Sequence, residues 1–343
     1  MTDVAREAGC SQATVSFVLN RAPGIKLSAE TRHRVFEAAR KLGYAAPAAE
    51  SPRPQGRLRV GFLVDQLGTS PEAVVAIEGA CQALRASNDL VLIAQSLNDP
   101  DLEAALVRNF IESGVSALVY MTIFTREVEL PPVLLDLDIP LILLNCYTAG
   151  QRFPSVVPSE IAGGQRATHH LIEHGHQRIG TITGEIWMEA AQDRLKGYRR
   201  ALATADIPFD PKLVFEGDWS ASAGYEGTRH LLSLDEPPTA IFCQNDRTAI
   251  GAYEALKEAG LTIPGDMSVV GYDDEEISRH MHPQLTTSVL PHRAMGQWIV
   301  EQIQGLPGGR LNGRYPILKL ECPLVERASV APPRKALKPL AAQ

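Results

Sequence analysis

The sequence lacks the features that mark disulfide-rich, membrane-spanning and secreted proteins. Its five cysteines are scattered, with no C-x-x-C spacing and no His partners in register, so neither a disulfide framework nor a zinc site is expected. No apolar run approaches the roughly 20 residues that are needed to cross a bilayer. No charged segment followed by an apolar one and then by small residues opens the chain, so we expect the protein to stay in the cytoplasm.

Signatures of common enzyme classes are also missing. The segment VGFLVDQLG does not match G-x-G-x-x-G, and the sequence contains no G-x-S-x-G elbow and no G-x-x-x-x-G-K-[ST] phosphate loop. His170 and His174 stand one helical turn apart, as a metal-binding pair would. No third ligand stands near them in the sequence, so histidines facing the dipole at a helix C-terminus are the favoured alternative. We therefore expect no catalytic activity, no cofactor and no metal.

What the sequence does contain is an uneven distribution of charge. The chain has 343 residues, 45% of them hydrophobic and 21% charged, which is a globular composition whose length favours two or three domains. Residues 1–59 hold ten Lys/Arg and five Asp/Glu, a net charge of +5, whereas the remainder holds 23 and 35, a net charge of −12. A small basic head on a large acidic body indicates that only the head binds a polyanion.

Three short helices are predicted in the head, residues 1–45. The first stops at Gly9, the second follows the N-cap Ser11 and runs to about Asn20, and the third follows the N-cap Ser28. The apolar positions expected to face inward are Val4, Ala5, Ala8, Val15, Val18, Leu19, Val35, Phe36, Ala39 and Leu42. Two helices joined by a tight turn and supported by a third form the helix-turn-helix plan, although any small three-helix domain has the same periodicities.

A proline-rich linker, residues 46–58, separates the head from an α/β body at residues 59–328, and residues 329–343 are expected to form a flexible tail. In the body, strands such as VGFLV, LVLIAQ, ALVYM, PLILLN, IGTITG, LVFEGD, TAIFCQ and SVVGYD alternate with amphipathic helices. The helices are expected near residues 72–86, 101–113, 163–174, 190–204, 221–234 and 246–259. Continuous apolar strands separated by helices predict parallel sheets covered on both faces, and the length predicts two lobes.

Polar and aromatic side chains follow several of these strands. The candidates are Asn145, Arg194, Trp219, Asn245, Asp246, Asp273 and Asp274. Asn, Asp and Arg supply paired donors and acceptors for hydroxyl groups, and Trp offers a flat apolar face to a sugar ring. Helix capping by the carboxylates and core packing by the Trp are the alternative. Because ligands in open α/β sheets bind at the carboxyl ends of strands, two facing lobes would form a cleft for a small molecule.

Motifs that match one known family stand in the same order along nearly the whole chain. In the head they are DVAREAG, SQATVSFVLN and LSAETRHRVFEAARKLGY, and in the body they include HLIEHGHQRIG, RLKGYRRAL, GDWSASAGY, FCQNDRTAIGAYEALKEAG and IPGDMSVVGYDD. Over residues 2–330 the sequence resembles the LacI/GalR family of bacterial transcriptional regulators. The resemblance implies a regulator, commonly a repressor, that binds pseudo-palindromic operator DNA as a homodimer. It also implies a two-lobed core similar to that of the periplasmic binding proteins, which senses a small-molecule effector.

The resemblance further implies roles for individual residues. The family's DNA-contacting positions correspond here to Ser11, Gln12, Ala13, Thr14, Ser16, Phe17, Asn20, Ser28 and Thr31. Its effector-binding positions correspond to Thr69, Ser70, Asn145, Arg194, Trp219, Asn245 and Asp273. Among the DNA-contacting residues, those at base-reading positions are Gln12, Ala13 and Phe17. Trp219 matches a sugar-stacking position, so the expected effector is a sugar or a sugar derivative.

The second helix of the head contains no Lys or Arg, so its expected contacts with bases are short and lean towards A·T pairs. Gln12 can pair with adenine N6 and N7, and Ala13 or Phe17 can press on a thymine methyl group. Phe17 can alternatively pack as core. The linker is an atypical hinge, because it has no Leu to insert into a minor groove and contains Pro52 and Pro54.

Two other protein classes are alternatives to a regulator. A pure solute-binding protein would have no basic head and would begin with a secretory signal. A sugar-processing enzyme on the same fold would place a catalytic acid/base pair in the cleft and would turn over its ligand.

Overall fold

The computed structural model describes residues 2–19, 28–42, 58–68, 71–85, 89–306, 311 and 313–333. The chain folds into two compact units, each built from separate stretches of sequence. Unit 1 comprises Met1–Val157 and His292–Leu318, and unit 2 comprises Pro158–Pro291 and Lys319–Gln343. Of the helices in the described residues, none combines the length and the apolar character that crossing a membrane requires.

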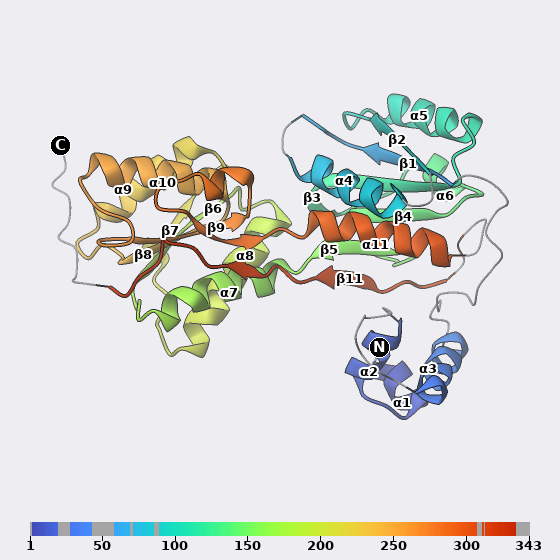
Figure 1. Cartoon of the computed structure of the whole chain (residues 1–343), viewed down its shortest axis with the longest axis horizontal. Helices are drawn as coiled ribbons and strands as arrows, with labels where there is room; N and C mark the ends of the chain where they lie inside the picture. Colours follow the sequence, from blue (N-terminus) through green and yellow to red (C-terminus); the bar gives the residue numbers. More distant parts are fainter. Residues whose placement is uncertain are drawn as a thin grey trace. The chain divides into compact units, whose positions relative to one another are not determined.

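The head contains the three predicted helices (Figure 1): α1 (Thr2–Ala8), α2 (Gln12–Leu19) and α3 (Ala29–Lys41). Gly9 takes the left-handed conformation (φ 61°) that the turn after α1 requires. Most of the expected inward positions form a core in which Val4, Val15, Val35 and Ala39 are 0% exposed, whereas the side chain of Leu19 lies outside the described part. The expectation for Leu42 is wrong: this residue is 41% exposed, because α3 ends at Lys41 and Leu42 lies in the turn that follows.

Unit 1 contains a six-stranded sheet of order β11-β5-β4-β3-β1-β2. Its strands are β1 (Arg59–Val64), β2 (Leu90–Gln95), β3 (Ala117–Glu127), β4 (Leu141–Tyr147), β5 (Ser155–Pro158) and β11 (Ile317–Leu320). Its helices are α4 (Glu72–Leu84), α5 (Pro100–Glu112), α6 (Pro132–Leu135) and α11 (His292–Gly305). Helices α4 and α11 lie side by side (Figure 1), while α5 and α6 pack on a separate core with Leu63, Leu118 and Leu143.

Unit 2 contains a second six-stranded sheet of order β12-β10-β9-β8-β6-β7. Its strands are β6 (Ile179–Thr183), β7 (Val214–Glu216), β8 (Ala240–Cys243), β9 (Ser268–Asp273), β10 (Thr286–Val289) and β12 (Leu324–Val325). Its α-helices are α7 (Glu160–Glu173), α8 (Glu189–Thr204), α9 (Ala221–Leu232) and α10 (Asp246–Glu258), and its 3-10 helices are η2 (Pro211–Leu213) and η3 (Glu276–Arg279). Successive residues of β8 face opposite cores: Ile241 packs with residues of α9 and α10, and Phe242 with residues of α7 and α8. Helices therefore cover both faces of the sheet.

The prediction of two sheets covered by helices is confirmed, with three corrections. The expected strand series ended at SVVGYD, whereas β10, α11, β11 and β12 follow it. The sheets are not wholly parallel, because β12 runs antiparallel to β10. The helix expected from Gly163 begins earlier, at Glu160.

Candidate DNA-binding and effector-binding sites

The start of α2 presents polar side chains to solvent. The Ser11 hydroxyl accepts a hydrogen bond from the Thr14 backbone N–H (3.1 Å) and pairs with the Thr14 hydroxyl (2.9 Å), so Ser11 is the helix cap that its position predicts. Ser11 and Gln12 are exposed and Thr14 is half-buried. Ala13, Ser16 and Phe17 lie on α2, but their side chains are outside the described part, and Asn20 lies outside the described residues.

The start of α3 repeats this arrangement. The Ser28 hydroxyl accepts from the Thr31 backbone N–H (3.1 Å) and pairs with the Thr31 hydroxyl (2.8 Å). A surface ion pair between Lys41 and Glu7, with 2.5 Å between the Nζ and Oε1 atoms, links α3 to α1. The head thus presents the capped N-termini of two helices, and such N-termini favour negatively charged groups such as phosphates.

In unit 2, the side chain of Arg194 lies at the centre of the candidate effector-binding residues. The Arg194 side chain extends from α8 and is 5% exposed. Its Nε and Nη2 donate to the two carboxylate oxygens of Glu160 at 2.8 and 3.0 Å, and its Nη1 lies 3.4 Å from Asp273 Oδ1 and also donates to the Gln244 carbonyl. Burial opposes the charge of the guanidinium, but the carboxylates of Glu160 and Asp273 outweigh it and raise the pKa of Arg194. The group is therefore a fixed cation held by two carboxylates.

Trp219 and Asn245 lie beside this cluster. The Arg194 guanidinium carbon is 5.4 Å from the Trp219 ring centroid, and the Trp219 indole N–H donates to Met188 Sδ (3.1 Å). The ring lies so close to Gly184 that a Cβ at that position would be 1.9 Å from Trp219 Cε2. Asn245 caps α10 by accepting from the Thr248 N–H (2.9 Å), and its amide donates to the Trp219 carbonyl (3.0 Å). The cap of α10 is thus Asn245 and not its neighbour Asp246, for which capping was the alternative role, and Asn245 in addition holds the Trp219 backbone.

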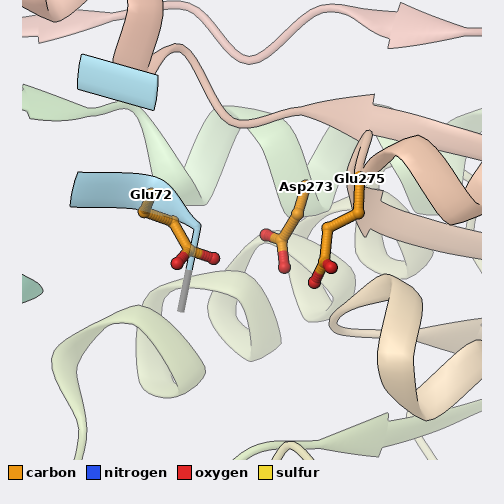
Figure 2. A group of neighbouring side chains, drawn as sticks. All are labelled: Glu72, Asp273 and Glu275. Carbon is orange, nitrogen blue, oxygen red and sulfur yellow. The ribbon is translucent and has the colours of Figure 1, made fainter. Parts of the chain in front are cut away.

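Asp273 is the last residue of β9, and Glu275 lies two residues beyond it (Figure 2). Asp273 and Asp274 both adopt positive φ values of 108° and 54°, which turn the chain sharply after the strand. A carboxylate oxygen of Asp273 lies within 4.8 Å of one of Glu275. Buried Asp246 supports this turn by accepting from the Glu275 backbone N–H (2.8 Å) and from the Thr287 hydroxyl (2.6 Å).

Asn145 belongs to unit 1, at the carboxyl end of β4. Beside it, β3 departs from regular register between Met121 and Arg126. The Asn145 amide donates to the Thr122 and Ile123 carbonyls at 3.0 and 2.9 Å, and its oxygen accepts from the Thr125 hydroxyl at 2.6 Å. Asn145 is 2% exposed, so these contacts fix the irregular end of β3. Thr69 and Ser70 lie outside the described residues.

Three charged residues that contact the candidate site or its strand ends were not predicted from the sequence: Asp65, Arg126 and Glu160. Asp65, 3% exposed after β1, accepts from the Ile123 N–H (3.0 Å) and pairs with Arg126 (3.2 Å). Burial raises the pKa of Asp65 above its ordinary value. Glu160, at the start of α7, holds Arg194 although the two residues are 34 positions apart. Asp65 does stand directly after a predicted strand, but no local pattern marks Glu160.

Comparison with known proteins identifies two family models that match separate parts of the chain. A model of the lacI family of bacterial regulatory proteins matches residues 1–46, and a model of the periplasmic binding protein-like domain matches residues 168–330. The HTH-type transcriptional repressor PurR of Aliivibrio salmonicida is 31% identical over 300 residues, which cover 87% of this chain and 89% of that protein. The ribose operon repressor of Haemophilus influenzae is 31% identical over 333 residues, which cover 95% of this chain and 97% of that protein.

Solved structures of the family have the same fold. The lac repressor dimer bound to operator and the anti-inducer ONPF is 27% identical, with a TM-score of 0.66 over 96% of this chain and 98% of that one. A LacI family transcriptional regulator from Enterococcus faecium with bound ribose is 26% identical, with a TM-score of 0.64 over 80% of this chain and 99% of that one. The chain described here belongs to the lacI family of bacterial regulatory proteins, and it is a DNA-binding transcriptional regulator controlled by a small-molecule effector.

Proposed function

We propose that the protein is a cytoplasmic repressor that binds pseudo-palindromic operator DNA as a homodimer, has no enzyme activity, and changes its operator affinity when a sugar-like effector binds. The observation that carries the proposal is the joint presence of a helix-turn-helix head and the cluster of Arg194, Asp273 and Trp219 in the body. The ribose operon repressor among its relatives and the ribose-bound regulator among its structural neighbours support an effector of this class.

On DNA, we assign base reading to Gln12, Ala13 and Phe17, and phosphate contacts to Ser11, Thr14, Ser16, Asn20, Ser28 and Thr31. The exposed, capped starts of α2 and α3 support this assignment, because backbone N–H groups and hydroxyls there can donate to phosphates while Gln12 reaches a base edge. Exposed Arg6 and Arg32 supply attraction to the backbone, so α2 itself needs no cation.

For the effector, we assign Arg194, Trp219, Asn245 and Asp273 of unit 2, and Asn145, Thr69 and Ser70 of unit 1. The Asp273 carboxylate can accept hydrogen bonds from ligand hydroxyls, and the Trp219 ring can pack on the C–H face of a sugar. Asn145 contributes by holding the end of β3, since its amide is engaged with that strand.

Effector binding and operator affinity must be coupled reciprocally, so the same free energy appears in both measurements. We expect Asp273→Ala to abolish the effect of the effector on operator binding and to leave operator binding without effector unchanged. Arg194 keeps its pair of bonds to Glu160 in this variant, so unit 2 retains its buried ion pair.

The measurement is an operator-binding titration, with and without the effector that a thermal-shift screen of sugars identifies. Asp235→Ala is the matched control, because Asp235 is an exposed carboxylate between α9 and β8. A full effector response in Asp273→Ala would show that the effector binds elsewhere. Loss of ligand during incubation, with release of a product, would instead support a sugar-processing enzyme.

A further inference from the structure

The Arg194 guanidinium has little capacity left for an anionic ligand. An Arg side chain has five N–H donors in a rigid fork. Four of them already have acceptors within unit 2: two on Glu160, one on the Gln244 carbonyl and one on Asp273. Two-pronged binding of a phosphate or carboxylate by Arg needs two parallel N–H groups directed at the same ligand. Arg194 offers no such pair unless Glu160 or Asp273 moves away.

Two carboxylates share the single guanidinium of Arg194, and a third lies beside one of them. Glu160 and Asp273 both face this single guanidinium, and the Glu275 carboxylate lies within 4.8 Å of that of Asp273. Glu275 pairs with Arg247 at 3.1 Å, but the Arg247 side chain is 41% exposed and is screened by solvent. An anionic group placed at Arg194 would therefore lie beside carboxylates that repel it.

The neighbouring arginines are also occupied by carboxylates. Arg327, with a side chain that is 10% exposed, pairs with Asp274, and Arg279 pairs with the other oxygen of Asp274 at 3.1 Å. These arginines stabilise the turn after β9. Among the described residues at this end of the unit 2 sheet, each named arginine thus already has a carboxylate partner.

Aromatic surface is plentiful in the same region. Trp187 lies in the loop between β6 and α8 and is 69% exposed, which is unusual for the largest apolar side chain. Its neighbour Met188 contacts the Trp219 indole, so the loop that carries Trp187 is packed on Trp219. The indole of Trp187 donates to Glu185 Oε1 at 3.4 Å, which leaves its ring faces available for contact with a ligand.

We infer that the effector is an uncharged, hydroxyl-rich molecule, not a phosphorylated or carboxylated one, and that Trp187 adds a second aromatic contact to it. The inference rests on the proposed function and narrows it to a charge class. Ligand hydroxyls donate to Asp273 and accept from the remaining Arg194 N–H, and the ligand's C–H faces pack on the indole rings. An uncharged ligand makes these contacts without displacing Glu160.

The test is a thermal-shift experiment on the full chain with matched ligand pairs at equal ionic strength. The pairs are ribose with ribose 5-phosphate and glucose with both glucose 6-phosphate and gluconate; inorganic phosphate alone is a further arm. We expect the neutral member of a pair to raise the melting midpoint more than its anionic partner, and inorganic phosphate to have no effect beyond that of chloride.

A larger rise with the anionic member would overturn the inference and leave the proposed sugar-like effector standing. If no sugar acts, the proposed sugar-like effector fails, and the inference of a hydroxyl-rich ligand fails with it. In any arm, a phosphate-specific rise that Arg194→Lys removes would contradict the inference, because it would place an anion at Arg194.

Two variants sharpen the result. Asp273→Asn removes one of the carboxylates that face Arg194, so inorganic phosphate should now raise the melting midpoint.

Trp187→Ala should weaken binding of the neutral ligand at least several-fold, whereas Phe209→Ala should not. Phe209 is the matched aromatic control because it is 38% exposed and packs on Arg199, 4.4 Å from ring centroid to guanidinium carbon. Equal effects of the two aromatic variants would exclude a specific contact by Trp187.

Discussion

Gln12 occupies the first position of α2, and its amide is the longest polar group that the start of this helix exposes. The amide oxygen can accept from the adenine N6 amino group while the amide NH2 donates to N7, so the side chain reads adenine through two hydrogen bonds at once. We expect Gln12→Ala to lose roughly 1–3 kcal/mol on the preferred operator and to relax the preference at one base position. Binding titrations on operators with single substitutions measure both effects.

Gln82→Ala is the matched control for this variant, since Gln82 is exposed on α4 in the body. An equal loss on every DNA sequence would identify Gln12 as a phosphate contact and would remove its base-reading role.

Phe17→Ala separates the two alternatives for Phe17 in the same assay. Loss of the side chain would lower stability if Phe17 packs in the core, and would change operator specificity if Phe17 reads a base.

Asp246 is a buried carboxyl group whose protonation should affect stability. Desolvation by burial raises the pKa of Asp246 to about 7, although hydrogen bonds from Thr287 and the Glu275 N–H oppose the rise. The folded chain thus binds this proton more tightly than the unfolded chain does. The stabilisation is complete below the ordinary pKa of 3.8 and is lost as the pH rises through about 7.

Asp246→Asn imitates the protonated group, because its amide can donate to Thr287 and accept from the Glu275 N–H. We expect its free energy of unfolding relative to the wild type to increase between pH 5 and pH 8 by about 3 kcal/mol, since about two pH units lie between pH 5 and the folded-state pKa and each corresponds to about 1.4 kcal/mol. Denaturant titrations across this pH range give the difference. A pH-independent difference, equal to that of the exposed control Asp235→Asn, would contradict the assignment.

At the scale of single residues, the sequence predicted roles that depend on near neighbours and failed where the partner is distant. Ser11 and Ser28 were predictable as helix caps because each serine hydroxyl accepts a hydrogen bond from a backbone N–H only three residues further along the chain. Glu160 could not be identified, because its partner Arg194 comes from another helix. The effector contact predicted for Asn145 stays a prediction, and its contacts with the irregular end of β3 are not visible in the sequence.

The helix pair α9 and α10 illustrates how glycines set the packing of whole elements. A Cβ at Gly251 would lie 1.8 Å from the Ala221 carbonyl oxygen, and a Cβ at Gly224 would lie 2.0 Å from that of Thr248. The two helices therefore touch backbone to backbone, which places the start of α10 and its cap Asn245. Neither contact can be relieved by rotation of a flexible side chain.

We expect Gly251→Ala to lower the free energy of unfolding by at least about 1–3 kcal/mol, because the helices must separate to admit the methyl group. Gly305→Ala is the control, since a Cβ at Gly305, at the end of α11, meets no atom within 4 Å. Denaturant unfolding of both variants measures the difference. If Gly251→Ala were as stable as Gly305→Ala, the close approach of α9 and α10 would not be needed for stability.

Elements were predictable where hydrophobic periodicity is strong and continuous. The apolar runs Val60–Val64 and Ile179–Thr183 predicted β1 and β6, and both runs are fully buried in the structure. Capping residues predicted the starts of several helices to within a few residues. β12 was missed because a strand of two residues, Leu324–Val325, carries no periodicity. Its antiparallel pairing with β10 also depends on residues about 37 positions away, which a local pattern does not encode.

At the scale of the whole molecule, the basic head, the acidic body and the repeated α/β pattern could be predicted from the sequence. The assignment of individual segments to the two units could not. The sequence predicted two lobes within residues 59–328 but not which segments form each unit: His292–Leu318 belongs to unit 1 and Lys319–Gln343 to unit 2. Helix α11 joins unit 1 because Gly79 and Gly296 let it approach α4 closely. Such a return depends on complementary surfaces over 200 residues apart.

The proposed homodimer makes a prediction about the geometry of the operator. A single head offers few base-reading groups, so tight specific binding needs two heads on two half-sites that face the same side of the DNA. Inserting five base pairs at the operator centre rotates one half-site by about half a helical turn, and we expect this to reduce the affinity to that of a single half-site. Light scattering should give a mass twice that of the 37.2-kDa chain for the free protein, and that mass plus the mass of one operator duplex for the complex. Equal affinity for the operator and for one isolated half-site would show that each chain binds DNA independently, and the effector would then have no spacing between heads to control.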